Sequence, residues 1–461
     1  MKANNPDWTA PRTNQDWRDD ELMLAVAWLK SFVPRKEMEQ RLDVAKTNLL
    51  AAQDRIRAGI MGPLFDPVDT AAWYILQAET FATDRALWTP EGTMRVVPFL
   101  TRIGKELKLL LSVKGVEERA ARMMLQERRQ PDSSIFEMLV ALAYRRRGWR
   151  RVEFVPETPG RGRTPDMHVF RTGTRWAAEC KRLVPSTYAA NEKLRGTRLA
   201  QPIHRLCLEL GESVIVEVKY QVELREIADD YLVRHVRQAI ERRSLAPWKD
   251  EVATGRVRPI NWTLLRRILA KDYVYFDGSR MIELLAGHYD HSADHSMAAK
   301  WRPAPLRPTY ADAVYQASVV SWVSESDAAV RQKARHFRST IANAERQLPS
   351  DRPGVIHVGV ESSAGAGVDF ARHFFNTMQA RTFAPATSSL RWVYANYFVP
   401  EATTRENETW AITETMVPYK IGQHRTRWPL PDHMLVAPEN ESESGVHWHP
   451  TSDAAANSNQ E

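Results

Sequence analysis

Acidic and basic side chains in two neighbouring segments could meet at one edge of a sheet. Residues 165–170 (PDMHVF) and 175–181 (RWAAECK) indicate two short strands, and the Thr-Gly-Thr between them indicates a turn. Side chains alternate across a strand, so Glu179 and Lys181 share one face, with their Cα atoms ~7 Å apart. If the strands pair as a hairpin, Asp166 lies beside Glu179. We therefore expect two carboxylates and a lysine to converge.

This set of side chains suits the hydrolysis of a phosphate ester. Two carboxylates hold a hard divalent cation such as Mg²⁺ through oxygen, and leave positions for water and for a phosphate oxygen. The cation acidifies its water and offsets charge on the phosphoryl group. A lysine beside it can orient the attacking water or stabilise developing negative charge. Asp166 and Glu179 are thus candidate ligands of Mg²⁺ (or Mn²⁺), and Lys181 is a candidate catalytic residue.

The order and spacing of these residues resemble a known nuclease signature. Pro165-Asp166, twelve intervening residues and then Glu179-Cys180-Lys181 are similar to the motif of the PD-(D/E)XK nuclease superfamily. The resemblance implies the restriction-endonuclease-like fold, an α/β class in which a mixed sheet core is flanked by helices. It also implies a magnesium-dependent nuclease.

An upstream helix carries a third acid. Residues 135–149 (IFEMLVALAYRRRGW) are apolar through their first turns apart from Glu137. A buried carboxylate needs a partner or a metal, although a glutamate at the edge of a helix can equally lie in water or pair with an arginine. In resolvase-like members of the superfamily, a Phe-Glu pair on this helix often supplies a site carboxylate. Phe136-Glu137 matches that pattern, so the resemblance implies Glu137 as a third metal ligand and site residue.

The expected core needs a strand before the hairpin and a helix–strand pair after it. Residues 150–157 (RRVEFVPE) indicate the earlier strand. Two pairs could complete the sheet: helix 191–210 with strand 213–220, or helix 327–348 with strand 354–361. The second pair is preferred, because its helix is long, ends at a proline and precedes the apolar strand GVIHVGVE. This step also resembles the helix-to-strand step of many PD-(D/E)XK nucleases.

The preferred pair divides the chain into six segments. We expect an all-α N-terminal region before the core and a large insertion within it, whose role could be target recognition or dimerisation. The expected segments are a flexible arm (1–18), an all-helical domain (19–130), the first part of the nuclease core (131–187), the insertion (188–325), the second part of the core (326–430) and a disordered tail (431–461).

Basic residues are concentrated around the candidate site. The chain has a net charge of +7, and residues 140–200 contain 14 Lys and Arg against 5 Asp and Glu. A basic surface beside a phosphate-cleaving site favours a polyanionic partner, although charge runs usually form a solvated face. The candidate nucleic-acid-binding residues are Arg145, Arg146, Arg147, Arg150, Arg151, Arg161, Arg163, Arg182, Lys333 and Arg335.

Two other motifs are weaker candidates for a catalytic or metal site. Glu217-Val218-Lys219 is a second Glu-x-Lys on an expected strand, but no Pro-Asp strand precedes it at hairpin distance. His288, His291 and His295 have a spacing that could bind zinc, but polar loop histidines are the simpler reading.

Cysteine content and hydropathy bear on the compartment. With only Cys180 and Cys207, the chain has no disulfide framework, which favours a reducing cytosol. The N-terminus has no apolar signal core, and no run approaches eighteen apolar residues. We expect a cytoplasmic protein with no membrane partner.

The sequence therefore indicates a metal-dependent nuclease, with DNA as its expected substrate and a role in restriction, antiphage defence or repair. The pattern does not separate DNA from RNA, and it is compatible with a homo-oligomer or a partner protein. One alternative is a catalytically silent nucleic-acid-binding protein with the same fold. Another is an interaction protein whose basic face binds an acidic protein. Two acids without a metal would repel phosphate, which favours the enzyme.

Overall fold

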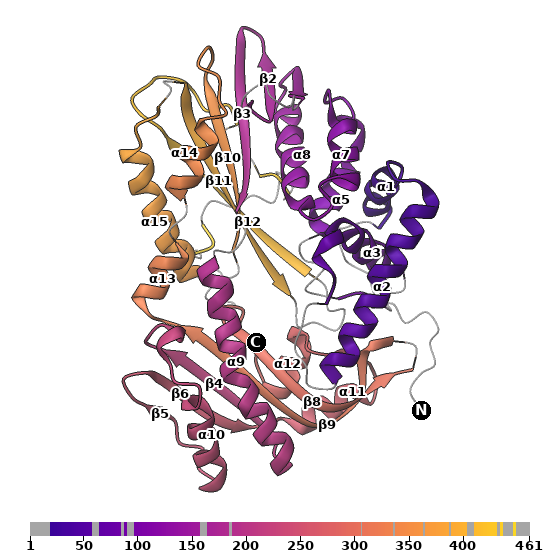
Figure 1. The fold of residues 1–461 in the computed structure, drawn as a ribbon, viewed down its shortest axis with the longest axis vertical. Helices are drawn as coiled ribbons and strands as arrows, with labels where there is room; N and C mark the ends of the chain where they lie inside the picture. Colours follow the sequence, from indigo (N-terminus) through magenta and orange to yellow (C-terminus); the bar gives the residue numbers. More distant parts are fainter. Residues whose placement is uncertain are drawn as a thin grey trace.

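The chain folds into a mixed α/β structure with two mixed sheets flanked by helices (Figure 1). The computed structural model describes residues 19–57, 64–83, 87–89, 96–156, 164–183, 187–305, 307–334, 337–362, 365–386, 389–402, 410–430, 434–436 and 446–448.

The helices fall into three groups along the chain. The N-terminal group is α1 (Asp19–Lys30), α2 (Arg35–Arg57), the 3₁₀ turn η1 (Pro67–Asp69), α3 (Thr70–Ala82), α5 (Val97–Lys105), α6 (Leu107–Leu110), α7 (Val116–Leu125) and α8 (Pro131–Arg146). The middle group is α9 (Thr187–Leu210), the 3₁₀ turn η2 (Leu224–Glu226), α10 (Tyr231–Glu241), α11 (Trp262–Leu269) and α12 (Ser279–Ala286). The last group is α13 (Asp327–Lys333), α14 (Phe337–Glu345) and α15 (Ala366–Thr382).

The first sheet has the order β1-β2-β3-β10-β11-β12. Its strands are β1 (Arg151–Phe154), β2 (Met167–Arg171), β3 (Thr174–Leu183), β10 (Gly354–Glu361), β11 (Leu390–Ala402) and β12 (Trp410–Lys420). The pairs β1–β2, β2–β3 and β11–β12 are antiparallel, whereas β10 runs parallel to both β3 and β11.

The preferred helix–strand pair is the one that reaches this sheet. Strand β10 coincides with the expected strand 354–361 and pairs with β3. The competing strand 213–220 appears as β4 (Val214–Tyr220) in the other sheet. The expected single helix 327–348 is instead described as two helices, α13 and α14.

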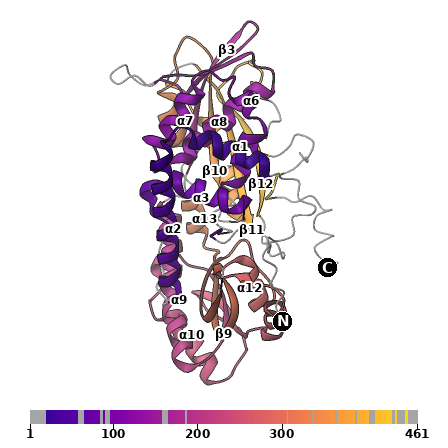
Figure 2. The same cartoon turned by 90° about the vertical axis from the view of Figure 1, so that its right-hand side faces the viewer.

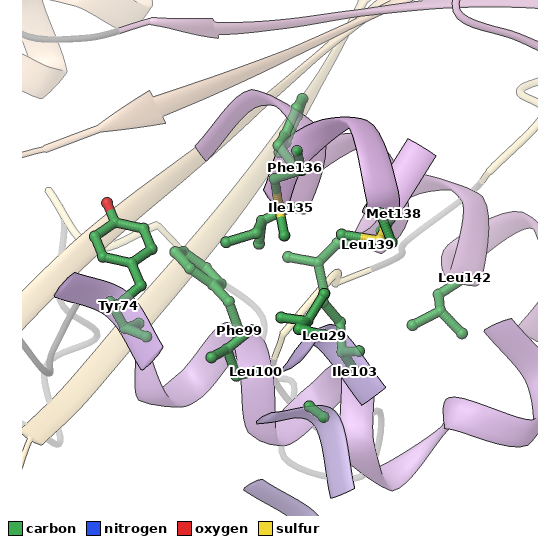
Figure 3. Close-up of a cluster of buried hydrophobic side chains, with 14 of the residues drawn as sticks. Leu29, Tyr74, Phe99, Leu100, Ile103, Ile135, Phe136, Met138, Leu139 and Leu142 are labelled. Carbon is green, nitrogen blue, oxygen red and sulfur yellow. The ribbon is translucent and has the colours of Figure 1, made fainter. Parts of the chain in front are cut away.

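Helices cover both faces of the first sheet. Helix α8 packs on one face, backed by α1, α3, α5 and α7, and their apolar side chains form one large core. Figure 3 shows the middle of that core, where Ile135, Phe136 and Leu139 of α8 meet Phe99 and other helical side chains. Helices α14 and α15 lie on the opposite side (Figure 1). There Phe337 and Ile341 pack in a separate core with Ala177 of β3.

The second sheet and its helices form the other end of an elongated molecule (Figures 1 and 2). The order is β5-β6-β4-β9-β7, with β8 paired to β9. The strands are β4, β5 (Trp248–Lys249), β6 (Ala253–Pro259), β7 (Val274–Tyr275), β8 (Asp294–Ala304) and β9 (Arg307–Ser324). Their apolar residues form two further cores, one shared with α9 and α10 and one with α11 and α12. A buried ion pair, Lys333 Nζ to Glu192 Oε2 at 2.6 Å, joins α13 to α9.

Within the part of the chain that the structure describes, no helix is both long and apolar enough to cross a bilayer.

Helix α8 approaches the sheet closely at a glycine. A Cβ at Gly359 of β10 would lie 2.8 Å from Cε2 of the Phe136 ring. That ring is held on another side by Phe398, with ring centroids 6.2 Å apart and nearly perpendicular planes. Because Phe136 precedes Glu137, this contact sets how closely the acid on α8 approaches the sheet.

We therefore expect Gly359→Ala to destabilise the protein by about 1–3 kcal/mol, the usual cost of overpacking a core. Gly367→Ala, in the first turn of α15, is the control, because a Cβ there meets nothing within 4 Å and alanine favours helix. Urea unfolding measures both variants. Equal midpoints for Gly359→Ala and wild type would contradict this close contact.

Candidate active site

The candidate site forms where β2 begins and β3 continues. The first residue of β2, Met167, pairs with Ala178, and β3 runs five residues further to Leu183. At this point Oδ2 of Asp166 accepts a hydrogen bond from the backbone N–H of Cys180 at 2.7 Å. The backbone N–H of Asp166 in turn donates to Oε2 of Glu179 at 3.1 Å. Each carboxylate is therefore held by a backbone amide of the opposite strand.

The lysine of the motif lies beside its glutamate. Nζ of Lys181 is 2.5 Å from Oε1 of Glu179, as expected for side chains two residues apart on one face of a strand. Glu179 is fully buried, whereas 32% of the Lys181 side chain is exposed. The ammonium group thus lies between the buried acid and solvent.

The third acid reaches the same place from α8. Glu137 is 4% exposed, and its Oε2 forms an ion pair with Nη2 of Arg119 on α7. The same Nη2 lies 4.0 Å from Oδ1 of Asp166. Arg119 is therefore shared by two acids from different elements. Sequence reasoning named an arginine as an alternative partner for Glu137, but gave no signal that the arginine would come from residue 119.

Burial raises the pKa values of all three acids, and repulsion by Asp166 raises those of Glu137 and Glu179 further. Burial raises the pKa of Glu137 to about 8, and the charge of Asp166 adds to the shift while Arg119 opposes it. Burial also raises the pKa of Glu179 to about 8, with Asp166 again adding and Lys181 opposing. Burial raises the pKa of Asp166, against the hydrogen bond from Cys180 and the charges of Lys181 and Arg119. A cation close to these carboxylates would therefore be favoured.

The chemistry of this set fits a hard divalent cation. Mg²⁺ and Mn²⁺ prefer carboxylate oxygens, and Oε2 of Glu137 and Oε1 of Glu179 are buried beside the cations of Arg119 and Lys181. The ion pairs with Arg119 and Lys181 offset their charge. As they stand, the described side chains include no group of three or more His, Cys, Asp or Glu arranged to hold a metal. Asp166 and Glu179 would hold the ion, with Glu137 as the third ligand.

Several of the predicted phosphate-binding residues are engaged inside the protein. Arg146 donates to the carbonyl oxygens of Met434 and Leu435 at 3.0 and 3.3 Å. Arg182 is buried against Glu361, at 3.4 Å. Lys333 forms the buried ion pair with Glu192 described above. These three charges are therefore not presented to a ligand.

The remaining predicted basic residues differ in exposure. Arg145 donates to the carbonyl oxygen of Trp149 at 2.7 Å, and Arg147 is half-buried. Arg150 and Arg151 are exposed. Arg161, Arg163 and Arg335 lie outside the residues that the structure describes.

A basic and aromatic face on the hairpin was not predicted as a unit. The guanidinium carbons of Arg151 and Arg175 lie 5.2 and 4.9 Å from the centroid of the Phe170 ring. Both arginines are exposed, and Arg175 shares a face of β3 with Glu179. Stacking leaves the N–H edges of a guanidinium group available to phosphate, although Nε and Nη2 of Arg151 also bind Oε1 of Glu153. We call Arg151, Phe170 and Arg175 the hairpin face.

The two competing motifs have partners of their own. Glu217 pairs with Arg256 and Arg258, and Lys219 lies 3.2 Å from Glu325. His288 lies 3.1 Å from Glu217. These residues lie on or beside the second sheet, away from the candidate site.

His295 is also engaged in the second sheet. It lies between the Ser321 hydroxyl, at 2.8 Å, and the Asp290 carbonyl, at 2.9 Å. Its ring therefore has hydrogen-bonding partners at both nitrogens without a metal.

Comparison with known proteins gives no relative from which to transfer a function. The chain matches no protein-family model, no curated protein and no solved structure at a significant level. What the protein does is therefore inferred from its own residues.

Proposed function

We propose that this protein is a metal-dependent nuclease that hydrolyses phosphodiester bonds, with DNA as its substrate. The observation that carries the proposal is the convergence of Glu137, Asp166 and Glu179 with Lys181 where β2 begins. Two buried acids, from α8 and β3, and a half-buried acid just before β2 are costly to bring together. Such a set is useful where a divalent cation and a phosphate must meet.

The order of elements supports the same proposal. Helix α8 is followed by the antiparallel strands β1, β2 and β3 and, after α9 and the second sheet, by α13, α14 and the parallel strand β10. This is the order that the resemblance to the PD-(D/E)XK superfamily implies. We propose that the first sheet with α8 and α14 is a restriction-endonuclease-like core, and that residues 188–325 are an insertion into it.

The proposed mechanism assigns each residue one task. A divalent ion on Asp166 and Glu179 would supply an acidified water and offset phosphoryl charge. The Cys180 and Asp166 amides keep the two carboxylates oriented, so little reorganisation is needed when substrate binds. Lys181, partly exposed beside Glu179, orients the attacking water or stabilises charge that develops in the transition state.

The hairpin face supports a nucleic-acid substrate. Arg151 and Arg175 lie on the same sheet as the site, and Phe170 between them offers an aromatic surface. Along β3, Arg175 is four residues from Glu179, which places them ~13 Å apart. That distance spans about two phosphates of one DNA strand. Contacts of this kind hold the backbone without reading sequence. Restriction, antiphage defence or repair is the setting that we propose.

Cleavage of supercoiled plasmid tests the catalytic assignment. Wild type should cut in Mg²⁺ or Mn²⁺ and not in EDTA. Lys181→Ala should lose at least ~100-fold in rate, because groups that act on transition-state charge or proton transfer contribute at about that level. Lys219→Ala is the matched control, because Lys219 belongs to the other Glu-x-Lys and pairs with Glu325. It should cut at the wild-type rate.

Cleavage that survives Lys181→Ala would remove Lys181 from the proposed mechanism. DNA binding without cleavage by folded wild type under all metal conditions would favour a binding protein instead.

The salt dependence of DNA binding tests the hairpin face. Arg175→Ala should lower the slope of log affinity against log salt by about 0.9, the value for one lost phosphate contact. Arg266→Ala is the control, because Arg266 is also an exposed arginine stacked on an aromatic ring, 5.5 Å from the centroid of Trp262, but lies on α11. Fluorescence anisotropy at several salt concentrations measures both. A slope unchanged by Arg175→Ala would show that DNA does not contact this face.

A further inference from the structure

The charges at the candidate site are nearly balanced by the protein itself. Three carboxylates, on Glu137, Asp166 and Glu179, face two cations, on Arg119 and Lys181. Lys181 forms an ion pair with Glu179, whereas Arg119 contacts Glu137 and lies close to Asp166. The Arg119 side chain is 13% exposed, so its charge is desolvated beside the acids. Removing one partner of a buried ion pair destabilises the folded protein, because the other charge is left buried without a counter-ion.

Arg119 uses the oxygen that a metal would need. Its Nη2 contacts Oε2 of Glu137 and lies 4.0 Å from Oδ1 of Asp166. A guanidinium donates N–H groups to the lone pairs of a carboxylate, and a divalent cation binds the same lone pairs directly. A carboxylate has about four lone-pair sites, so the two compete for the position between Glu137 and Asp166 where Nη2 of Arg119 lies. The Arg119 guanidinium and a divalent cation bound beside it are both positive, and they would repel each other strongly in a partly buried site.

From this geometry we infer that Arg119 is a built-in counter-ion, which occupies the cation position between Glu137 and Asp166 and competes with the divalent metal for it. The inference rests on the proposed function. It makes Arg119 a positioning residue: it stabilises the acids when no metal is bound and lowers the affinity of the site for metal. A metal ion that binds between Glu137 and Asp166 then requires that Arg119 leave this position.

The helix that carries Arg119 is fixed more firmly than the side chain. Val116, Ala120 and Met123 of α7 are buried in the main core, and the backbone N–H of Arg119 donates to the Gly115 carbonyl at 3.1 Å. Replacement of Arg119 by a metal ion therefore involves movement of the long arginine side chain and leaves α7 in place.

Metal binding and stability should change in opposite directions in Arg119→Gln. The variant should melt at a lower temperature than wild type in EDTA, because Glu137 loses its counter-ion. It should nevertheless bind Mn²⁺ roughly tenfold more tightly or better, because a like charge close to the ion is removed. Free Mn²⁺, measured by electron paramagnetic resonance during titration of DNA-free protein, gives the affinity. A residue with a merely structural role would lower both stability and affinity.

Arg122→Gln is the matched control for this experiment. Arg122 lies one turn along α7 and also forms an ion pair, with Oε1 of Glu127 at 2.6 Å, and Glu127 is not a proposed metal ligand. Its Mn²⁺ affinity should equal that of wild type. If Arg119→Gln does not fold, Arg119→Met replaces it: this side chain keeps an unbranched stem but carries no charge, so Mn²⁺ binding should again be tighter than in wild type.

Two outcomes separate the inference from the function on which it rests. If wild type binds Mn²⁺ and cuts DNA, but the folded Arg119 variant binds Mn²⁺ equally or more weakly, the counter-ion role is overturned and the nuclease stands. If wild type neither binds Mn²⁺ nor cuts DNA, both are overturned.

Discussion

The site depends on a simple mismatch between two strands: β2 begins at Met167, whereas its neighbour β3 continues to Leu183. A backbone N–H that loses its partner strand needs another acceptor, and at Cys180 this acceptor is the Asp166 carboxylate. The requirement fixes an acid at the sheet edge. Just before β2 begins, Glu137 and Arg119, from helices on one face, approach Asp166.

Packing on both faces keeps this edge in place. On one side α8 presses Phe136 against Gly359, and on the other α14 packs Phe337 and Ile341 over Ala177 of β3. The strand that carries Glu179 and Lys181 is thus central in its sheet, between β2 and β10. Burying the acids lowers the free energy of unfolding, and the apolar packing on both faces of the sheet offsets part of this loss.

Local patterns predicted what depends on local geometry. Alternation along 175–181 placed Glu179 and Lys181 on one face, and the long helical pattern that ends at a proline before an apolar strand selected 354–361 as the strand that joins the sheet. Charge counts were less informative, because they do not show whether a side chain finds an internal partner: Arg146 and Arg182 lie buried among such partners. Arg119 could not be predicted, because its role arises from the packing of α7 against α8, which sequence spacing does not encode.

Anomalous diffraction from crystals soaked in Mn²⁺ would test the central claim most directly, because it locates the ion independently of any activity. The account predicts a manganese peak bonded to the carboxylates of Asp166 and Glu179. A well-ordered site without such a peak at saturating Mn²⁺, or a peak only elsewhere in the molecule, would contradict it.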